Sequence, residues 1–82
     1  MSWFLYIVEC ADASYYTGIT TDIDRRIDEH NTGKGAKYTQ GRGPVSVVYT
    51  EKFEDRSQAS KREFEIKTLT KEQKKKLIQS LR

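Results

Sequence analysis

The chain has 82 residues, of which 35% are hydrophobic and 33% charged. This length supports one compact core, so we expect a single domain over residues 1–82. The longest apolar run, 3–8, ends at Glu9 and follows no basic stretch, which excludes a membrane-spanning helix and a signal peptide and favours a cytoplasmic protein. One cysteine and one histidine exclude an internal disulfide and a Cys/His metal cage, so any metal must be held by carboxylates.

The net charge of +3 is small, but the basic residues are unevenly distributed. The segment 61–82 contains eight basic and three acidic residues, and the segment 34–42 contains three basic residues and no acid. Such segments are either solvated surface or a surface that follows the phosphates of a nucleic acid. Both interpretations remain open from charge alone.

The first half of the chain predicts a β-hairpin. Residues 3–10 carry bulky apolar side chains at odd and even positions, which is typical of a strand that is covered on both faces at the centre of a sheet. Residues 11–14 form a turn signal, and 15–19 are rich in strand-forming residues. We expect Gly18 to end the regular part of this second strand.

A helix and a glycine-rich loop are expected next. Thr21 followed by Asp24 resembles a helix capping box, so we expect a helix over 22–30 that ends at the polar residues 31–33. The following loop contains several glycines and one proline, with room for one helical turn near 36–40.

The last third predicts one strand and two helices. Residues 45–50 predict a third strand, because this segment carries β-branched side chains on both faces. Helices are expected over 55–67 and 70–81. Two capping pairs predict where these helices begin: Asp55 with Gln58, and Thr70 with Gln73. The predicted order is therefore β-β-α-β-α-α, an α+β domain with a three-stranded sheet flanked by helices.

Two tyrosines and two basic side chains are placed together by this arrangement. A three-residue hairpin loop pairs Val8 with Tyr16, which puts Tyr6 and Tyr16 on the same face of the sheet. Arg26 and His30 are four residues apart on the first helix and therefore share a face.

A carboxylate interrupts the apolar stripe of the second predicted helix. Ala59, Glu63 and Ile66 follow helical spacing, so Glu63 lies where an apolar residue is expected and needs a partner. Two phenols, a guanidinium and this carboxylate suit phosphodiester chemistry with one hard cation better than acyl transfer. The segment 33–35 is Gly-Lys-Gly, but the phosphate-binding pattern GxxxxGK[ST] is absent.

These motifs resemble the GIY-YIG nuclease superfamily over almost the whole chain. The stretches 17–22 and 33–37 are similar to small stand-alone bacterial members of this group. The superfamily elements, in order, are Phe4-Leu5-Tyr6, Tyr16-Thr17-Gly18, Arg26, His30 and Glu63.

The resemblance implies one active site on the face of the sheet. It assigns Tyr6 as the general base for the attacking water, Tyr16 as an assisting tyrosine and Arg26 as the group that neutralises charge on the phosphate. His30 matches a histidine of many members, and Glu63 matches the carboxylate that holds a single Mg²⁺ or Mn²⁺. The first motif lacks its glycine, Thr17 replaces an apolar residue, and Lys67 is the candidate for a polar group that follows the glutamate in many members.

We therefore expect a divalent-metal-dependent endonuclease that acts on nucleic acid, with DNA favoured over RNA. The residues expected to contact the nucleic acid are Lys34, Lys37, Arg42 and Lys67. Because the chain has no added DNA-binding domain, a protein partner is expected to supply targeting. Two alternatives remain open: a non-catalytic nucleic-acid-binding module with the same fold, and an interaction domain that uses its basic C-terminal helix.

Overall fold

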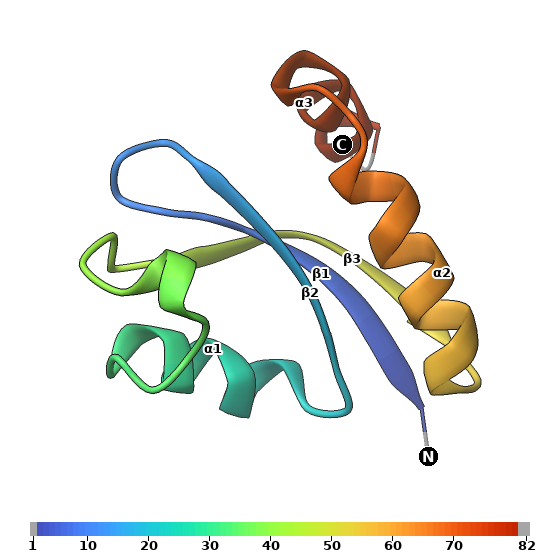
Figure 1. The fold of residues 1–82 in the computed structure, drawn as a ribbon, viewed down its shortest axis with the longest axis horizontal. Helices are drawn as coiled ribbons and strands as arrows, with labels where there is room; N and C mark the ends of the chain where they lie inside the picture. Colours follow the sequence, from blue (N-terminus) through green and yellow to red (C-terminus); the bar gives the residue numbers. More distant parts are fainter. Residues whose placement is uncertain (1, 81–82) are drawn as a thin grey trace.

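The computed structural model describes residues 2–80 and contains the predicted elements in the predicted order. In chain order they are β1 (Trp3–Glu9), β2 (Tyr15–Thr20), α1 (Ile23–Asn31), the short 3₁₀ helix η1 (Lys37–Thr39), β3 (Ser46–Phe53), α2 (Arg56–Lys67) and α3 (Lys71–Gln79). Figure 1 shows the three strands at the centre with the helices around them. The α+β fold class is therefore confirmed.

The sheet is antiparallel, and β1 is its central strand, as predicted. Val8 pairs with Tyr16 in the hairpin, which confirms the predicted register. The same register places Tyr6 opposite Gly18. Since side chains alternate between the two faces of a sheet, Tyr6 and Tyr16 project from the same face.

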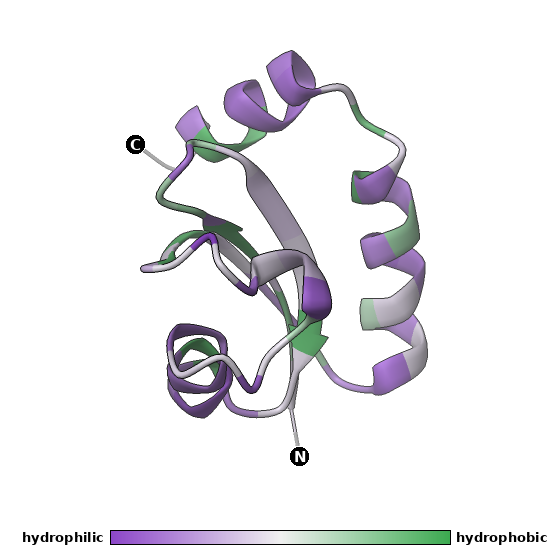
Figure 2. Ribbon diagram, turned by 60° about the vertical axis from the view of Figure 1, so that its left-hand side comes forward, coloured by the Kyte–Doolittle hydropathy of each residue, from purple (hydrophilic) through white to green (hydrophobic). Residues whose placement is uncertain are grey.

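Each face of the sheet has its own apolar core. On one face, α2 and α3 cover a buried cluster that consists of Leu5, Ile7, Tyr49, Ile66 and Ile78. On the other face, a second cluster contains Tyr6, Val8, Cys10 and Val45, with Ile27 of α1 packed against it. Figure 2 shows α1 and α2 on opposite sides of the strands. The double burial of β1 explains why its sequence is apolar at both parities.

Helix capping matches the predictions at two of three positions. Asp55 accepts a hydrogen bond from the Gln58 backbone N–H, and Thr70 and Gln73 form a complete capping box. The prediction for α1 is wrong by one residue, because Asp22 is the N-cap and accepts from the Arg25 backbone N–H at 3.1 Å. Helix α3 ends at Gln79, so the predicted end at Leu81 lies outside the described residues.

Gly18 has a different role from the one predicted. It does not end β2, which continues to Thr20, but lies under the side chain of Tyr6. A Cβ atom at position 18 would come within 2.5 Å of the Tyr6 hydroxyl oxygen and 2.7 Å of the ring. Real Cβ contacts are not this short, so the absence of a side chain at Gly18 is what allows Tyr6 to lie across β2.

An ion pair fixes α2 to the sheet on the face away from Tyr6. Arg62 donates two hydrogen bonds to Glu51 of β3, at 2.9 and 3.0 Å, and the Tyr49 hydroxyl donates to the same carboxylate. Burial raises the pKa of Glu51, but the hydrogen bonds from Arg62 and Tyr49 outweigh burial and hold this pKa below its usual value. The pair thereby helps to set the position of α2, which carries Glu63.

The β3 strand is longer than predicted and continues to Phe53 rather than ending at Thr50.

Thr17 of β2 is buried, and its hydroxyl has no hydrogen-bond partner within residues 2–80. An unpaired buried hydroxyl costs about 1–3 kcal/mol of folding free energy.

Within residues 2–80, no helix combines the length and the apolar character needed to cross a membrane.

Candidate active site

Tyr6 lies at the centre of a polar cluster on the face of the sheet that α1 covers. Its side chain is 1% exposed, and its hydroxyl oxygen lies 2.9 Å from Nε2 of His30. The Nε–H group of Arg26 donates to the same hydroxyl at 3.4 Å. His30 and Arg26 both come from α1, where their spacing of four residues directs them to one side of the helix. Helix α1 therefore supplies both partners of Tyr6.

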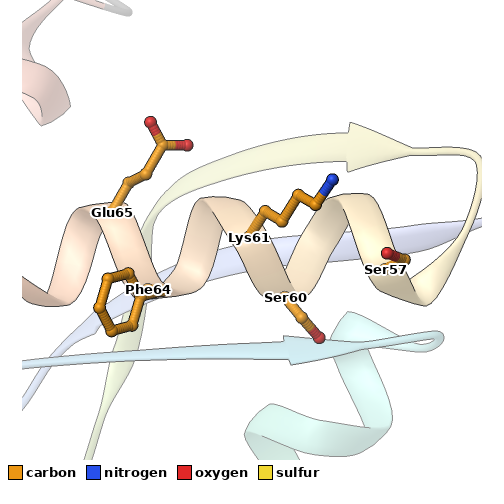
Figure 3. A pocket seen from close by; sticks show the side chains of 5 residues that line it. All are labelled: Ser57, Ser60, Lys61, Phe64 and Glu65. Carbon is orange, nitrogen blue, oxygen red and sulfur yellow. The ribbon is translucent and has the colours of Figure 1, made fainter.

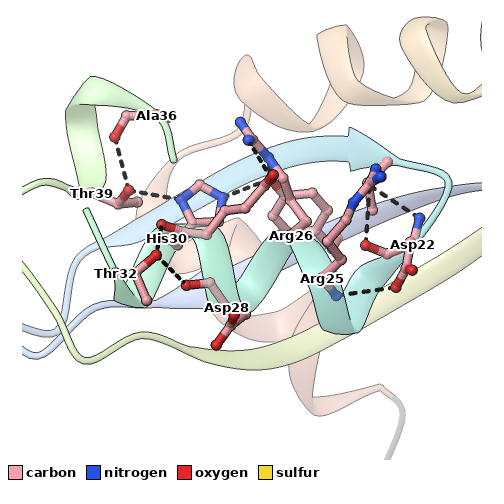
Figure 4. Close-up of polar contacts among 11 residues, drawn as sticks. Asp22, Arg25, Arg26, Asp28, His30, Thr32, Ala36 and Thr39 are labelled. Atoms are coloured by element: carbon pink, nitrogen blue, oxygen red, sulfur yellow. Dashed lines mark hydrogen bonds and ion pairs between the residues drawn. The ribbon is translucent and has the colours of Figure 1, made fainter. Parts of the chain in front are cut away.

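The hydrogen bonds around His30 favour one tautomer of its ring (Figure 4). The Thr39 hydroxyl donates its one proton to the Ala36 carbonyl at 2.9 Å, so its oxygen must accept from His30 Nδ1, 2.7 Å away. This pattern favours the tautomer of His30 that carries its proton on Nδ1. In the neutral ring Nε2 is then an acceptor, and the Tyr6 hydroxyl donates to it.

Burial and charge decide which groups of this cluster are ionised. Burial raises the pKa of the Tyr6 phenol, and Arg26 opposes that rise only in part. Burial, together with the nearby Arg26 charge, lowers the pKa of His30 below its ordinary 6.5. At neutral pH, Tyr6 is thus a neutral phenol beside a neutral imidazole, with a cation at hydrogen-bonding distance.

Tyr16 closes the cluster on the β2 side. Its ring centroid lies 6.4 Å from that of Tyr6 and 5.4 Å from that of His30. Its other neighbour is Tyr38 of η1, which stacks on it with centroids 5.9 Å apart and planes 27° apart. Tyr16 therefore lies between the Tyr6–His30 pair and Tyr38.

Glu63 reaches the rim of this cluster from α2. Ala59 and Ile66 of the same stripe are fully buried, whereas the Glu63 side chain is 24% exposed. Its carboxylate pairs with Lys67 at 3.3 Å, and the Lys67 ammonium lies 5.8 Å from the Tyr16 ring centroid. The Glu63 charge also contributes to the raised pKa of Tyr6. The structure thus joins Tyr6, Tyr16, Arg26 and His30 by direct contacts, whereas the contact partner of Glu63 is Lys67 and its link to Tyr6 is electrostatic.

The basic residues predicted to contact nucleic acid do not share one environment. Lys34 and Lys37 are exposed, and Lys67 pairs with Glu63. Arg42 pairs with Asp12 of the hairpin turn at 2.5 Å and lies 4.5 Å above the Tyr38 ring. Hydrogen bonds from Ser14, and then Arg42, lower the pKa of Asp12 to about 2. The segment 34–42 is acid-free in sequence, but folding brings an acid to it.

Three residues that support the site were not identified from the sequence. Thr39 orients His30, Tyr38 stacks on Tyr16, and Gly35 packs directly against His30. A Cβ atom at position 35 would lie 2.4 Å from His30 Nδ1 and 2.8 Å from its Cα. The glycine-rich composition of 33–43 signalled a loop, but it does not distinguish a glycine that turns the chain from one that lies against a ring.

The donor set of the site fits a weakly held hard cation. The described residues contain no group of three or more His, Cys, Asp or Glu side chains that could hold a metal. Mg²⁺ is commonly held by one or two carboxylates, with waters and substrate phosphates as its other ligands. Glu63, with a partly exposed carboxylate at the rim, suits this mode, provided that Lys67 gives up its ion pair.

A wider hollow of about 600 Å³ lies elsewhere on the surface, along α2 (Figure 3). It is lined by Ser57, Ser60, Lys61, Phe64 and Glu65, and Phe64 is 72% exposed there. None of the clustered tyrosine, histidine or arginine side chains lines it. The volume of a surface hollow therefore does not mark the position of the polar cluster.

Comparison with known proteins identifies relatives over nearly the whole chain. The family model for the GIY-YIG catalytic domain matches residues 2–76. A UPF0213 protein of Haloquadratum walsbyi is 57% identical over 76 residues, covering 93% of this chain and 85% of the relative. A UPF0213 protein of Staphylococcus aureus is 53% identical over 77 residues, covering 94% of each chain.

Two solution NMR structures have the same fold. The UPF0213 protein of Bacillus halodurans is 49% identical, with a TM-score of 0.62 over 96% of this chain and 84% of the other. A protein of E. faecalis is 44% identical, with a TM-score of 0.67 over 99% of this chain and 86% of the other. The matched range 2–76 includes every residue of the polar cluster. The chain therefore belongs to the GIY-YIG catalytic domain family and, within it, to the UPF0213 proteins.

Proposed function

We propose that this protein is a divalent-metal-dependent endonuclease that hydrolyses phosphodiester bonds in nucleic acid by attack of water. The observation that carries the proposal is the hydrogen-bonded chain from Tyr6 through His30 to Thr39, with Arg26 on the same phenol. A base, a cation and a rim carboxylate around one hydroxyl are the groups that phosphodiester hydrolysis requires. Membership in a catalytic domain family supports the same assignment.

The geometry supports a proton relay rather than a stored phenolate. Because the pKa of Tyr6 is raised, its phenol is protonated at neutral pH before the reaction begins. Tyr6 instead accepts a proton from the attacking water while it passes its own proton to His30 Nε2. The water oxygen forms the new bond to phosphorus, the bond to the leaving oxygen breaks, and the leaving oxygen takes a proton from solvent.

Arg26 and His30 have distinct tasks in this relay. Arg26 is hydrogen-bonded to the Tyr6 oxygen and stabilises the negative charge that develops there and on the phosphate. His30 becomes an imidazolium whose Nδ1–H remains held by Thr39. Tyr16 restricts the position of the His30 ring from the other side.

The proposed cofactor is one Mg²⁺ or Mn²⁺ held by Glu63. When bound, such a cation supplies positive charge to a phosphoryl oxygen and to the leaving group. Glu63 must leave Lys67 to bind it, and Lys67 is then available for a substrate phosphate. We also propose DNA rather than RNA as the substrate, and contacts from Lys34 and Lys37 outside the cluster.

One observation favours a second candidate, a nucleic-acid-binding module without catalysis. The ion pair with Lys67 neutralises the one carboxylate that the site offers to a metal. If this pair persists when nucleic acid binds, the fold retains its basic surface without a cofactor. Substitution of Glu63 distinguishes the two candidates.

Glu63→Gln is expected to lower cleavage by at least about 100-fold and to leave nucleic-acid binding unchanged. The pair with Lys67 is partly exposed, so the free energy of unfolding should change by less than about 1 kcal/mol. The measurement is cleavage of labelled linear, nicked, flapped and branched DNA and RNA with Mg²⁺, Mn²⁺ or chelator. Glu65→Gln, an exposed carboxylate two residues further along α2, is the control.

Three outcomes of this experiment differ in meaning. Metal-dependent cleavage by the wild type and by Glu65→Gln, with loss in Glu63→Gln, is the result we expect. Binding of substrates by the wild type without cleavage of any of them supports the non-catalytic module. Cleavage that Glu63→Gln retains at the wild-type rate removes Glu63 from the active site.

A further inference from the structure

A small polar pocket lies beside the candidate active site, where β2, η1 and α3 meet. Its volume is about 190 Å³, and it is lined by Ser14, Tyr15, Tyr38, Lys71 and Lys74. Drug-sized ligands occupy pockets of roughly 300–1,000 Å³, so this pocket has room for a phosphate group with part of a sugar and not for a base pair. None of these five residues belongs to the Tyr6 cluster.

Tyr38 connects this pocket to the candidate active site. One face of its ring stacks on Tyr16, whose ring lies 5.4 Å from His30. Arg42 lies over the Tyr38 ring at 4.5 Å, so this ring already has both an aromatic and a cationic neighbour. The pocket therefore suits a polar group that meets the lysines rather than a stacking base.

The charge of the pocket favours an anion. Lys71 and Lys74 line it, and neither takes part in the ion pairs found within residues 2–80. The Lys71 ammonium lies 5.8 Å from the Tyr15 ring centroid, at the wall of the pocket. A site lined by two cations and no acid attracts phosphate.

The acids nearest in sequence to the pocket residues are neutralised by other partners. Asp12 pairs with Arg42 and also accepts the Ser14 hydroxyl proton, and Glu72 lies 3.9 Å from Lys75. Neither acid therefore offsets the charge of Lys71 and Lys74. Lys67, the last residue of α2, adds a third basic side chain, whose ammonium lies 5.8 Å from the Tyr16 ring centroid.

We propose that Lys71 and Lys74 bind a backbone phosphate of the substrate strand next to the scissile phosphate. This inference rests on the proposed function and deepens it, because it defines the path of the strand. From the Tyr6 cluster the strand passes Tyr16 and Lys67 and then enters the pocket beside Tyr38. The hydrolysed bond and the neighbouring phosphate are thus held by different helices, the first by α1 and α2 and the second by α3.

Salt-dependent binding tests this assignment without catalysis. Affinity for a labelled single-stranded oligonucleotide is measured without metal over a range of salt concentrations, for the wild type and for the Lys71→Gln/Lys74→Gln double variant. Loss of one phosphate contact should lower the slope of log K against log salt by about 0.7. The control is Lys52→Gln/Lys76→Gln, which removes the same charge from exposed positions outside the pocket.

The outcomes separate this proposal from the function on which it rests. A lower slope in the pocket variant and an unchanged slope in the control support the phosphate site. Equal slopes in the two double variants overturn the phosphate site and leave the nuclease proposal standing. A wild type that binds no oligonucleotide also overturns the phosphate site, and the cleavage panel then decides the nuclease proposal separately. Unfolding temperatures of the two variants within a few degrees of the wild type show that a change in slope is not a loss of folding.

Discussion

Tyr6→Phe is expected to lower cleavage by about 100- to 10,000-fold, the range associated with loss of a general base. The substitution removes only the hydroxyl that contacts His30 and Arg26 and that accepts the water proton in the proposed relay. Nucleic-acid affinity should remain, because the basic residues outside the cluster are untouched. Single-turnover cleavage at saturating protein is the measurement.

Tyr49→Phe is the matched control for this substitution. Tyr49 is also a buried tyrosine of the sheet, but its hydroxyl donates to Glu51 on the opposite face. Tyr6→Phe leaves His30 Nε2 without its donor, and Tyr49→Phe removes one of the three hydrogen bonds to Glu51, so both should lose about 1–3 kcal/mol of stability. Only Tyr6→Phe should lose cleavage, and equal rates in the two variants would show that Tyr6 is a structural tyrosine.

Gly35→Ala is expected to damage both stability and cleavage. The added Cβ would lie 2.8 Å from the His30 Cα, which is backbone and cannot rotate away, and 2.4 Å from Nδ1. Forcing extra atoms into a packed site costs about 1–3 kcal/mol, and each kcal/mol lowers the unfolding temperature by about 4–8 °C in a domain of this size. The same shift separates His30 from Thr39 and Tyr6, so cleavage should fall with it.

Gly43→Ala controls for the loss of glycine in the same loop. The nearest atom that its Cβ would meet is Asn31 Oδ1 at 3.8 Å, an ordinary contact. Thermal unfolding and cleavage of this variant should stay close to the wild type. If Gly35→Ala unfolds and cleaves like Gly43→Ala, then Gly35 does not fix the position of His30.

The hairpin and the site face were predictable because they depend on local rules. A strand alternates its side chains with a period of two, so a three-residue loop is enough to place Tyr6 and Tyr16 on one face. Helical spacing similarly places Arg26 beside His30. When the hairpin and α1 pack against each other, the two tyrosines come into contact with His30 and Arg26.

The hydrogen-bond partners were not predictable, because they come from elements distant in sequence. Tyr6 meets His30 across 24 residues, and Arg42 meets Asp12 across 30. Thr39 becomes the partner of His30 only when the glycine-rich loop folds back over α1, and a threonine in a polar loop carries no signal for that contact. Gly18 was misassigned for the same reason, since the ring that it accommodates belongs to the neighbouring strand.

The protonation state of His30 tests the central claim most directly, and the chain contains only this one histidine. Nitrogen-15 NMR of the imidazole reports both its tautomer and its pKa without overlap from other rings. The proton relay predicts a neutral ring at pH 7 with its proton on Nδ1 and a pKa below 6.5. A ring protonated on Nε2, or one that is cationic at pH 7, could not accept the Tyr6 proton and would contradict the relay.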